Sequence, residues 1–498
     1  MLVVTNRYLR GLLRVMTPAA AAAAGVLVIT VLALFVYPYL GIADNGDFFR
    51  VLYSNGLYIS DPTYDSQYLG FFVKTYGIFQ YYNENQATIF STQSSFVKAA
   101  IGLNQLFHPG TTTFDIRYQA ALYLGLYTAA IYLLVEALTW KLSKLRGYVI
   151  AGIVVFVFGD TGYTAYFNSL YGESVMLIMT MFMVASGLLL YRKRYNDYVM
   201  LGLFVVSAMI LTASKQQNAP VGILTAIFGV FFIYIRKSRS YRAITAGLLA
   251  ALIGVGVGTY VLIPKEFVNI NKFHAMTRGV LMGSTDPEKT LESFGIDKQY
   301  AILNRSEYYE PYKSFDVNSA QFEEQFFSKY GFVSILSYYV AHPGQAGQML
   351  NIAARDGFSI RPMAMGNYEK SVGKPFGAHT VFFSGYSLLK QALAPKTFGF
   401  ILLWTLLIIG LYVPSFIHAI RSQQWRKATK LPIVILLISM GLSGIFVSII
   451  GAGDADLAKH EFLFTLTFDL VSLLTVRDLI AKQLWSTESE SKQVGAAM

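Results

Sequence analysis

The chain contains ten separate apolar runs, and most of them are long enough to cross a lipid bilayer. A spanning helix needs roughly 20 mostly apolar residues. The hydrophobic content of 54% and the charged content of 14% are also unlike those of a water-soluble enzyme. The sequence therefore predicts an all-α polytopic membrane protein with about ten transmembrane helices. We expect these helices at residues 17–39, 118–139, 147–159, 174–191, 198–213, 220–235, 243–263, 396–420, 431–450 and 461–480.

Lysine and arginine gather at every second connection between these runs. Cytoplasmic loops collect such residues, so the pattern places both termini in the cytoplasm. It also accounts for the net charge of +11, and we expect no nucleic-acid partner. The basic groups are Arg7, Arg10 and Arg14; Lys141, Lys144 and Arg146; Arg192, Lys193 and Arg194; Arg236, Lys237, Arg239 and Arg242; Arg421, Arg426, Lys427 and Lys430; Arg477 and Lys482.

Two of the predicted outward segments, 41–117 and 264–395, are far longer than a simple connection requires. Long loops of this kind usually carry function, so we expect both to fold into a small outer layer. We interpret residues 1–485 as one transmembrane domain, followed by a disordered cytoplasmic tail at 486–498. The chain has no cysteine, which excludes disulfides, thiolate metal sites and a cysteine nucleophile.

The first outward segment begins with an acidic cluster. Asp44 and Asp47 lie beside a turn-forming Asn45-Gly46 pair directly after the first apolar run. Ionisable groups near bilayer depth usually face a polar cavity, so we expect the two carboxylates to be catalytic and Asn45 to contact substrate. The pair could instead hold a divalent cation such as Mg²⁺ or Mn²⁺. A structural alternative is an Asx turn in which Asp47 caps a helix starting at Phe48.

Two further outward connections carry polar candidates. Asn168 and Glu173 follow the third run; Glu173 is a catalytic candidate, or it could simply favour the start of the next helix. Lys215 lies on the outward side, against the charge expected there, and Gln216 follows it. Lys215 could bind a substrate phosphate or one of the carboxylates, whereas snorkelling towards lipid headgroups is the structural alternative.

A cation pair, Lys459-His460, precedes the last apolar run. Lysine supplies a point charge and histidine a hydrogen-bond donor, so the pair could hold a phosphate. Asp454 and Asp456 could instead bind these cations in a local salt-bridge cluster. In the second long segment, His342 and Arg361 are weaker candidates for substrate binding, because a histidine before a proline is more often a cap or a packing residue.

Common signatures of other membrane activities are missing. The sequence lacks G-x-x-x-x-G-K-[ST], a dinucleotide fingerprint and H-E-x-x-H. Nucleotide-driven pumping and zinc proteolysis therefore have no support, and we expect a donor other than a nucleotide.

The acidic first loop, the long second loop and the basic pair before the last run together resemble the GT-C membrane glycosyltransferases. Four segments are similar to those of the bacterial WsfD-type glycan hexosyltransferases: Ala43–Phe48, Tyr166–Glu173, Ser214–Gln217 and Met282–Glu288. The resemblance implies a polyprenyl-phosphate sugar donor, such as an undecaprenyl phosphate, and a cell-surface glycan acceptor. It also implies an active site on the outer face of the bacterial cytoplasmic membrane, and rhamnose as one transferred sugar.

By the same resemblance, the family's first-loop acid falls on Asp44 or Asp47, and the donor-phosphate cations fall on Lys459 and His460. Many relatives carry arginine where Lys459 stands, and this departure removes bidentate phosphate binding.

Elementary chemistry predicts a single displacement that inverts the anomeric centre. A departing phosphate monoester has a second pKa of roughly 6 and needs no strong acid. The acceptor hydroxyl must lose a proton, and the first choice for its base is Asp44. The main alternative function is a transporter or flippase of lipid-linked glycans, which would carry ionisable residues in mid-helix; a non-catalytic scaffold is another.

Overall fold

All ten predicted ranges are helical in the computed structural model, which describes residues 16–80, 90–310 and 314–484. The basic residues Arg7, Arg10 and Arg14 and the predicted tail lie outside the described residues. The ten helical segments are α2 (Pro18–Phe35), α5 (Arg117–Thr139), α6 (Lys144–Phe158), α8 (Glu173–Arg192), α9 (Asp197–Thr212), α10 (Ala219–Gly229) continued by η4 (Val230–Ile235), α11 (Arg239–Val261), α18 (Phe398–Arg421), α20 (Lys430–Ala452) and α22 (Phe462–Ile480).

Seven helices in the described part of the chain are long and apolar enough to cross a membrane. An eighth span results if α6 and the segment Thr161–Asn168, which meet at a 50° bend, are one broken helix. The other two predicted runs fall short for separate reasons: α9 has 16 residues, and α22 carries Asp469, Arg477 and Asp478. The fold is therefore that of a multi-pass membrane protein.

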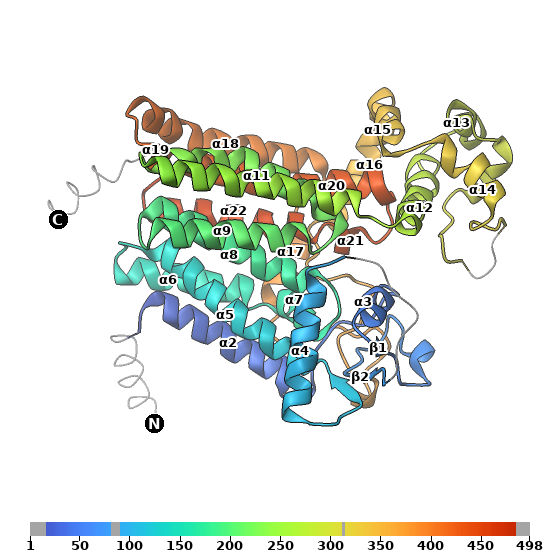
Figure 1. Ribbon diagram of the computed structural model, residues 1–498, viewed down its shortest axis with the longest axis horizontal. Helices are drawn as coiled ribbons and strands as arrows, with labels where there is room; N and C mark the ends of the chain where they lie inside the picture. The colour runs from blue at the N-terminus through green and yellow to red at the C-terminus, as the bar shows by residue number, and fades with distance from the viewer. Residues whose placement is uncertain (1–15, 81–89, 311–313, 485–498) are drawn as a thin grey trace.

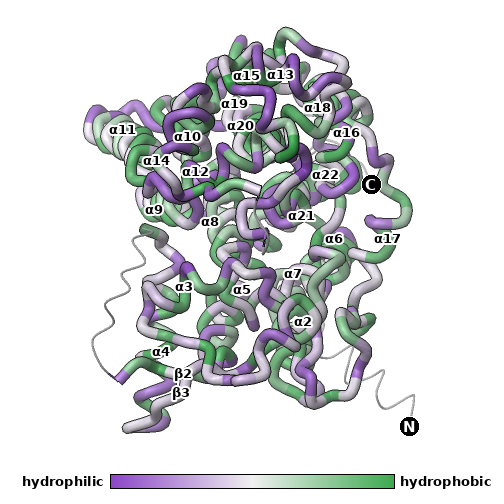
Figure 2. The backbone as a smooth tube through the Cα atoms, turned by 90° about the vertical axis from the view of Figure 1, so that its right-hand side faces the viewer, coloured by the Kyte–Doolittle hydropathy of each residue, from purple (hydrophilic) through white to green (hydrophobic). Residues whose placement is uncertain are grey.

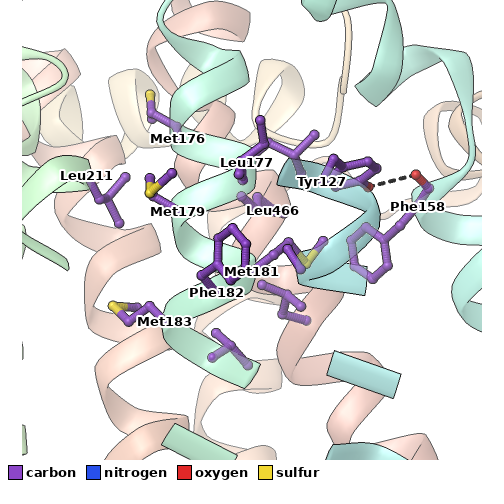
Figure 3. Packing of buried hydrophobic residues seen from close by; sticks show 14 of the residues in the cluster. Tyr127, Phe158, Met176, Leu177, Met179, Met181, Phe182, Met183, Leu211 and Leu466 are labelled. Atoms are coloured by element: carbon purple, nitrogen blue, oxygen red, sulfur yellow. Dashed lines mark hydrogen bonds between the residues drawn. The ribbon is translucent and has the colours of Figure 1, made fainter. Parts of the chain in front are cut away.

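Helix α8 lies inside the bundle, where it contacts α5, α9 and α22. Of its most apolar stretch, 94% is buried, and methionine side chains fill the space around it (Figure 3). Flexible methionine suits irregular gaps between helices. Where α5 meets the end of α6, the Tyr127 hydroxyl donates a hydrogen bond of 2.7 Å to the carbonyl of Phe158. The interior position of α8 brings its first residue, Glu173, into the centre of the molecule.

The first long segment folds around a small antiparallel sheet in the order β1-β2-β3. The strands are too short to be evident as alternating patterns in the sequence, and no strand was predicted here. The elements of this first long segment are α3 (Phe48–Ser54), β1 (Leu57–Tyr58), η1 (Tyr64–Ser66), β2 (Thr75–Ile78), α4 (Gln93–Phe107) and β3 (Thr113–Asp115).

The second long segment is helical and has an apolar core of its own, built largely from aromatic side chains such as Phe273, Phe322 and Phe326. The predicted amphipathic stretch 326–354 corresponds mainly to α15 and α16. The elements are α12 (Lys265–His274), the π-helical turn η5 (Ala275–Val280), α13 (Pro287–Ser293), η6 (Lys298–Leu303), α14 (Ala320–Gln325), η7 (Phe327–Lys329), α15 (Phe332–Ala341), α16 (Pro343–Asp356), η8 (Lys370–Val372) and α17 (Gly385–Leu393).

Apart from α17, which packs against α6 of the bundle, both long segments lie at the same end of the helix bundle and form what we call the loop layer (Figure 1). Seen from that end, hydrophilic stretches of the loop layer lie over the helix ends (Figure 2). The short helix α19 (Trp425–Ala428), in a basic connection, lies at the opposite end of the bundle. There Arg426 pairs with Asp197 at 2.9 Å. The two ends of the bundle thus differ in loop length, with both long segments at one end and the short connection through α19 at the other.

Candidate functional site

Five segments that are distant in sequence, one of them the start of α4, meet at a cavity of about 80 Å³ where the loop layer joins the bundle. The turn after α2 leads into α3, α8 begins here, and the turn before η3 (Gln216–Asn218) and the short helix α21 (Leu457–His460) complete the wall. The charged and amide side chains that line the cavity are Asp47, Arg50, Gln93, Glu173, Lys215, Gln216 and Lys459. Three cations and two carboxylates therefore face a single small space.

Lys459 is the most enclosed cation of this cavity, with 1% of its side chain exposed. Its ammonium group binds the Asp47 carboxylate directly and lies 2.7 Å from Oδ2 of Asp456. It also donates to Oδ1 of Asn45 at 3.3 Å. Burial alone would lower the pKa of Lys459, but the two aspartates outweigh it and raise that pKa above its ordinary range. Lys459 is therefore positively charged throughout the physiological range.

Of the two aspartates that pair with Lys459, Asp47 is the one that lines the cavity, and 32% of its side chain is exposed. Burial would raise the pKa of its carboxyl group, but the positive charges of Lys459 and Arg50 hold that pKa well below the usual range. Arg50, one helical turn further along α3, lies 3.5 Å from the other carboxylate oxygen. Asp47 is thus ionised, and both of its partners are cations.

Glu173 and Lys215 form a second ion pair in the lining of the cavity. Oε1 of Glu173 lies 2.6 Å from Nζ of Lys215, and the Glu173 side chain is fully buried. Its other oxygen, Oε2, has no hydrogen-bond partner, and neither does Nε of Arg50. A buried polar atom without a partner costs about 1–3 kcal/mol. Two residues that line the cavity, Arg50 and Glu173, therefore each carry a buried polar atom that the described residues leave without a hydrogen bond.

Asp44 is held by hydrogen bonds within the turn that follows it. Its Oδ1 accepts hydrogen bonds from the backbone N–H of Gly46 at 2.8 Å and of Phe48 at 3.1 Å, and the Tyr64 hydroxyl donates to Oδ2. The helix starts at Phe48 with Asp47 at its N-cap position, as the structural alternative has it, but the Asp47 side chain makes no capping bond, and the Asp44 side chain stabilises the turn instead. Burial raises the pKa of Asp44. Because its oxygens are occupied within the protein, Asp44 holds the loop that presents Asp47.

His460 follows Lys459 but supplies no positive charge. Burial, together with the nearby charges of Lys215 and Lys459, lowers the pKa of the imidazole to about 3. The ring is therefore neutral at pH 7. The backbone carbonyl of His460 accepts a hydrogen bond of 2.8 Å from the Gln217 side chain, which ties α21 to η3. The positive charges that accompany Lys459 at this cavity are those of Arg50 and Lys215, and His460 adds none.

Asn45 and Asn168 connect the site to its surroundings. Asn45 donates to Oδ2 of Asp456 at 2.6 Å. Asn168 is fully buried and donates to the carbonyls of Leu34 and Leu40, at 3.2 and 2.8 Å. It therefore fixes the chain where it leaves α2 and does not line the cavity.

The two candidates from the second long segment lie outside the cavity. The His342 ring stacks on Tyr338 at a centroid distance of 4.1 Å, in the wall of a separate groove. Arg361 is buried and donates to the Asn367 side chain and to the carbonyl of Thr380. The structural interpretation that we considered for His342 fits both residues.

Sequence reasoning missed Arg50, Tyr64 and Tyr171. Arg50 ends the same polar segment as Asp44 and Asp47, and its spacing of three residues from Asp47 was a usable signal. The Tyr171 hydroxyl accepts from the backbone N–H of Asn45 at 2.8 Å, and its ring lies 4.9 Å from Lys459. No pattern in the sequence marked either tyrosine.

A divalent cation does not fit this donor set. Within residues 16–80, 90–310 and 314–484, no three His, Asp or Glu side chains are grouped as metal ligands. The oxygens of Asp44 are occupied by hydrogen-bond donors, whereas Asp47 is held by Lys459 and Arg50. A cation placed between the two aspartates would meet these positive charges. We therefore derive no step through a metal.

Comparison with known proteins gives one match. A family model described as the YfdI N-terminal transmembrane domain matches residues 6–496, nearly the whole chain. No curated protein and no solved structure matches the chain.

Proposed function

The chain belongs to the YfdI N-terminal transmembrane domain family, a GT-C-type, glycosyltransferase-like membrane family, and from that premise we propose that it transfers a sugar from a polyprenyl-phosphate donor to a glycan. The sugar is a hexose or deoxyhexose, with rhamnose as one candidate, as in the WsfD-type enzymes that the sequence resembles. The acceptor is a bacterial cell-surface glycan.

The observation that carries this proposal is the composition of the cavity. Arg50, Lys215 and Lys459 supply positive charge for a phosphate, and the unpartnered Nε of Arg50 offers it a hydrogen bond. The unpartnered Oε2 of Glu173 accepts a hydrogen bond from a sugar hydroxyl. An anion joined to a polyol satisfies both unpartnered atoms at once, which neither an apolar ligand nor a simple cation does.

The reaction needs little from the protein beyond positioning, charge stabilisation and one base. The acceptor oxygen forms a bond to the anomeric carbon while the bond from that carbon to the phosphate oxygen breaks. The electron pair of the broken bond leaves with the polyprenyl phosphate, whose developing charge Lys459 and Arg50 stabilise. Attack opposite the leaving phosphate inverts the anomeric centre, as expected for a single displacement.

Asp47 is better placed than Asp44 to take the acceptor proton. Its carboxylate lines the cavity and is ionised, whereas the oxygens of Asp44 bind Gly46, Phe48 and Tyr64. A positioned carboxylate contributes about 10²–10⁴ in rate. In this proposal Asp47 is the base, and Asp44 is a positioning residue.

The grouping of loops supports an outward-facing site. The cavity lies beneath the loop layer, whereas the basic connections that mark cytoplasmic loops lie at the other end of the bundle. With the bundle oriented by this rule in a bacterial cytoplasmic membrane, donor and acceptor meet at the outer surface.

The proposal is tested by sugar transfer in detergent from a panel of synthetic polyprenyl-phosphate sugars to glycan acceptors. We compare the wild-type protein with Asp47→Asn, Glu173→Gln and the control Asp65→Asn, which removes an exposed carboxylate of the loop layer. We expect one donor to be consumed by wild type and control, and a loss of at least about 10²-fold in Asp47→Asn. Donor binding without turnover in wild type would contradict the proposal and favour a flippase.

A further inference from the structure

Asp47 differs from the other carboxylate of the cavity in how firmly it is held. The Glu173 side chain is fully buried and lies on the first turn of a central helix. Asp47 lies in the turn before α3, has 32% of its side chain exposed, and makes no capping bond that would fix it there. Its side chain can therefore leave Lys459 by rotation while the helix core stays in place.

The cavity is too small for a donor while Asp47 binds Lys459. Its volume of about 80 Å³ holds a few water molecules. Pockets for small-molecule ligands usually measure about 300–1,000 Å³. A sugar phosphate therefore requires a wall to move, and the Asp47 side chain, 32% exposed, is a polar part of that wall that is not enclosed by the protein.

Exchange of Asp47 for a phosphate conserves charge around Lys459. The phosphate of a polyprenyl-phosphate sugar is a diester with one negative charge, the same as an ionised carboxylate. In the ligand-free protein Lys459 is neutralised by Asp47 on the cavity side and by Asp456 on the other side. A phosphodiester that takes the cavity-side position leaves a buried lysine with two anionic partners, as before.

We propose that Asp47 is an internal stand-in for the donor phosphate, which displaces it from Lys459 when the donor binds. This inference rests on the proposed function. Arg50, at 3.5 Å, remains as the partner of the displaced carboxylate and keeps it in the cavity. Donor binding thus converts a carboxylate held by two cations into one held by Arg50 alone, which is the stronger base that the reaction requires.

The exchange also makes the strength of Asp47 as a base depend on whether a donor is bound. Without donor, Asp47 is tied to two cations and is a weak base. With donor bound, it loses its contact with Lys459 and accepts the proton of the acceptor hydroxyl more readily. After transfer, loss of that proton lets the carboxylate return to Lys459 and compete with the polyprenyl phosphate product. The base is therefore available when a donor is present to be attacked.

The test measures binding of methyl farnesyl phosphate, a singly charged phosphodiester without a sugar, to the purified protein in detergent by calorimetry. Asp47→Asn removes the carboxylate that competes with the phosphodiester for Lys459. We therefore expect this variant to bind methyl farnesyl phosphate about tenfold or more tightly than wild type, because a hydrogen bond between charged groups is then freed for the ligand. Asp47→Ser gives a second variant in the same direction. Lys459→Gln should lose most of the binding.

The matched control is Asp456→Asn. Asp456 also pairs with Lys459 and is equally exposed, at 31%, but it does not line the cavity. If loss of negative charge alone improved binding, both asparagine variants would gain equally, and the inference would be overturned. An Asp47→Asn variant that folds but binds no more tightly than wild type would overturn it as well.

Failure of this inference is distinguishable from failure of the proposed function. A wild-type protein that transfers sugar, combined with no gain in Asp47→Asn, rejects the exchange alone. A wild-type protein that neither transfers sugar nor binds the diester rejects both.

Discussion

Two buried lysines, Lys459 in the cavity and Lys390 in the bundle, each bind an aspartate, but the two pairs are built differently. Lys390 on α17 lies 2.6 Å from Oδ1 of Asp469 on α22, and their side chains are 4% and 0% exposed. Lys390 also donates to Thr465, and the Tyr163 hydroxyl donates to Oδ2 of Asp469 at 2.6 Å. The pair around Lys459 instead leaves Asp47 a third exposed, beside a cavity with unpartnered polar atoms.

The difference separates a structural ion pair from an exchangeable one. In the Lys390 pair, protein groups bind both carboxylate oxygens and the two side chains are 4% and 0% exposed, so a ligand cannot reach either partner. In the Lys459 pair, one partner can leave and its place can be taken. A buried charge is costly unless it is paired, so both lysines need an anion at all times. Only Lys459 can obtain that anion from outside the protein.

The largest expected effect is on folding and comes from breaking the Lys390 pair. Asp469→Ala leaves a buried ammonium group without its counter-charge, which costs about 3–5 kcal/mol. We expect a large fall in the midpoint of thermal unfolding, measured in detergent. Replacement of both partners by apolar residues, Lys390→Met with Asp469→Leu, should recover most of that loss because no buried charge remains.

The matched comparison is Asp47→Asn, which should change the unfolding midpoint far less, since Asp456 remains beside Lys459. Equal destabilisation by Asp469→Ala and Asp47→Asn would remove the distinction between the two pairs.

Most of the fold was predictable because apolar runs and basic connections report directly on the bilayer. All ten helices coincide with their predicted ranges, although α9 and α22 do not qualify as spans by length and composition. The charges of α22 explain why: Asp469 and Asp478 have buried partners, Lys390 and Lys430, on other helices. A sequence shows the charge in a helix but not the partner that makes it tolerable.

The candidate site was predictable in its residue types and in two of the pairings that the sequence left open: Lys215 binds the carboxylate of Glu173, and Lys459 pairs with Asp456. Asp47, Glu173, Lys215 and Lys459 were recognisable as charges in connections that face one side of the membrane. The contact between Asp47 and Lys459 joins residues 412 positions apart, which no local pattern encodes.

The roles of the two first-loop aspartates also depend on tertiary structure. Asp44 and Asp47 flank the same turn and are chemically identical. Tyr64, from a later part of the loop layer, selects Asp44 for the structural role, and Lys459 selects Asp47 for the cavity.

Exchange of Asp47 for the donor phosphate at Lys459 should make kcat and kcat/KM depend differently on pH. In the free protein Lys459 and Arg50 hold the pKa of Asp47 well below its usual range, so Asp47 stays ionised as the pH falls from 7 to 5. Its contribution to kcat/KM, which reports on the free enzyme, should therefore be flat there. In the donor complex the contact with Lys459 is lost, and burial raises the pKa. The value of kcat should then fall at a higher pH than kcat/KM.

The measurement is a pair of pH profiles in detergent with the preferred donor, using Asp65→Asn as the control that should match wild type. Identical acid limbs in kcat and kcat/KM would contradict an exchange at Lys459, because Asp47 would then have the same environment in both states.

The smallest expected effects come from removing one tyrosine hydroxyl beside Asp469 in the bundle and one beside Asp44 in the loop layer. Tyr163→Phe removes the hydroxyl that donates to Oδ2 of the buried Asp469, which should lower stability by about 1–3 kcal/mol. Tyr64→Phe removes the corresponding donor from Asp44, which keeps its two backbone donors at Gly46 and Phe48. Because Tyr64 is half-buried, water can replace its hydroxyl, and we expect a loss of about 1 kcal/mol or less.

Activity should respond in the opposite order to stability in these two variants. Tyr64→Phe loosens the loop that presents Asp47, so kcat should fall several-fold while the unfolding midpoint stays close to that of wild type. Tyr163→Phe should lower the midpoint and leave kcat of the folded protein unchanged, because Asp469 does not line the cavity. Unfolding curves and initial rates measured on the same preparations decide the matter. If both variants lost stability and kept kcat, Asp44 would have no positioning role, and the loop that carries Asp47 would be held by other contacts.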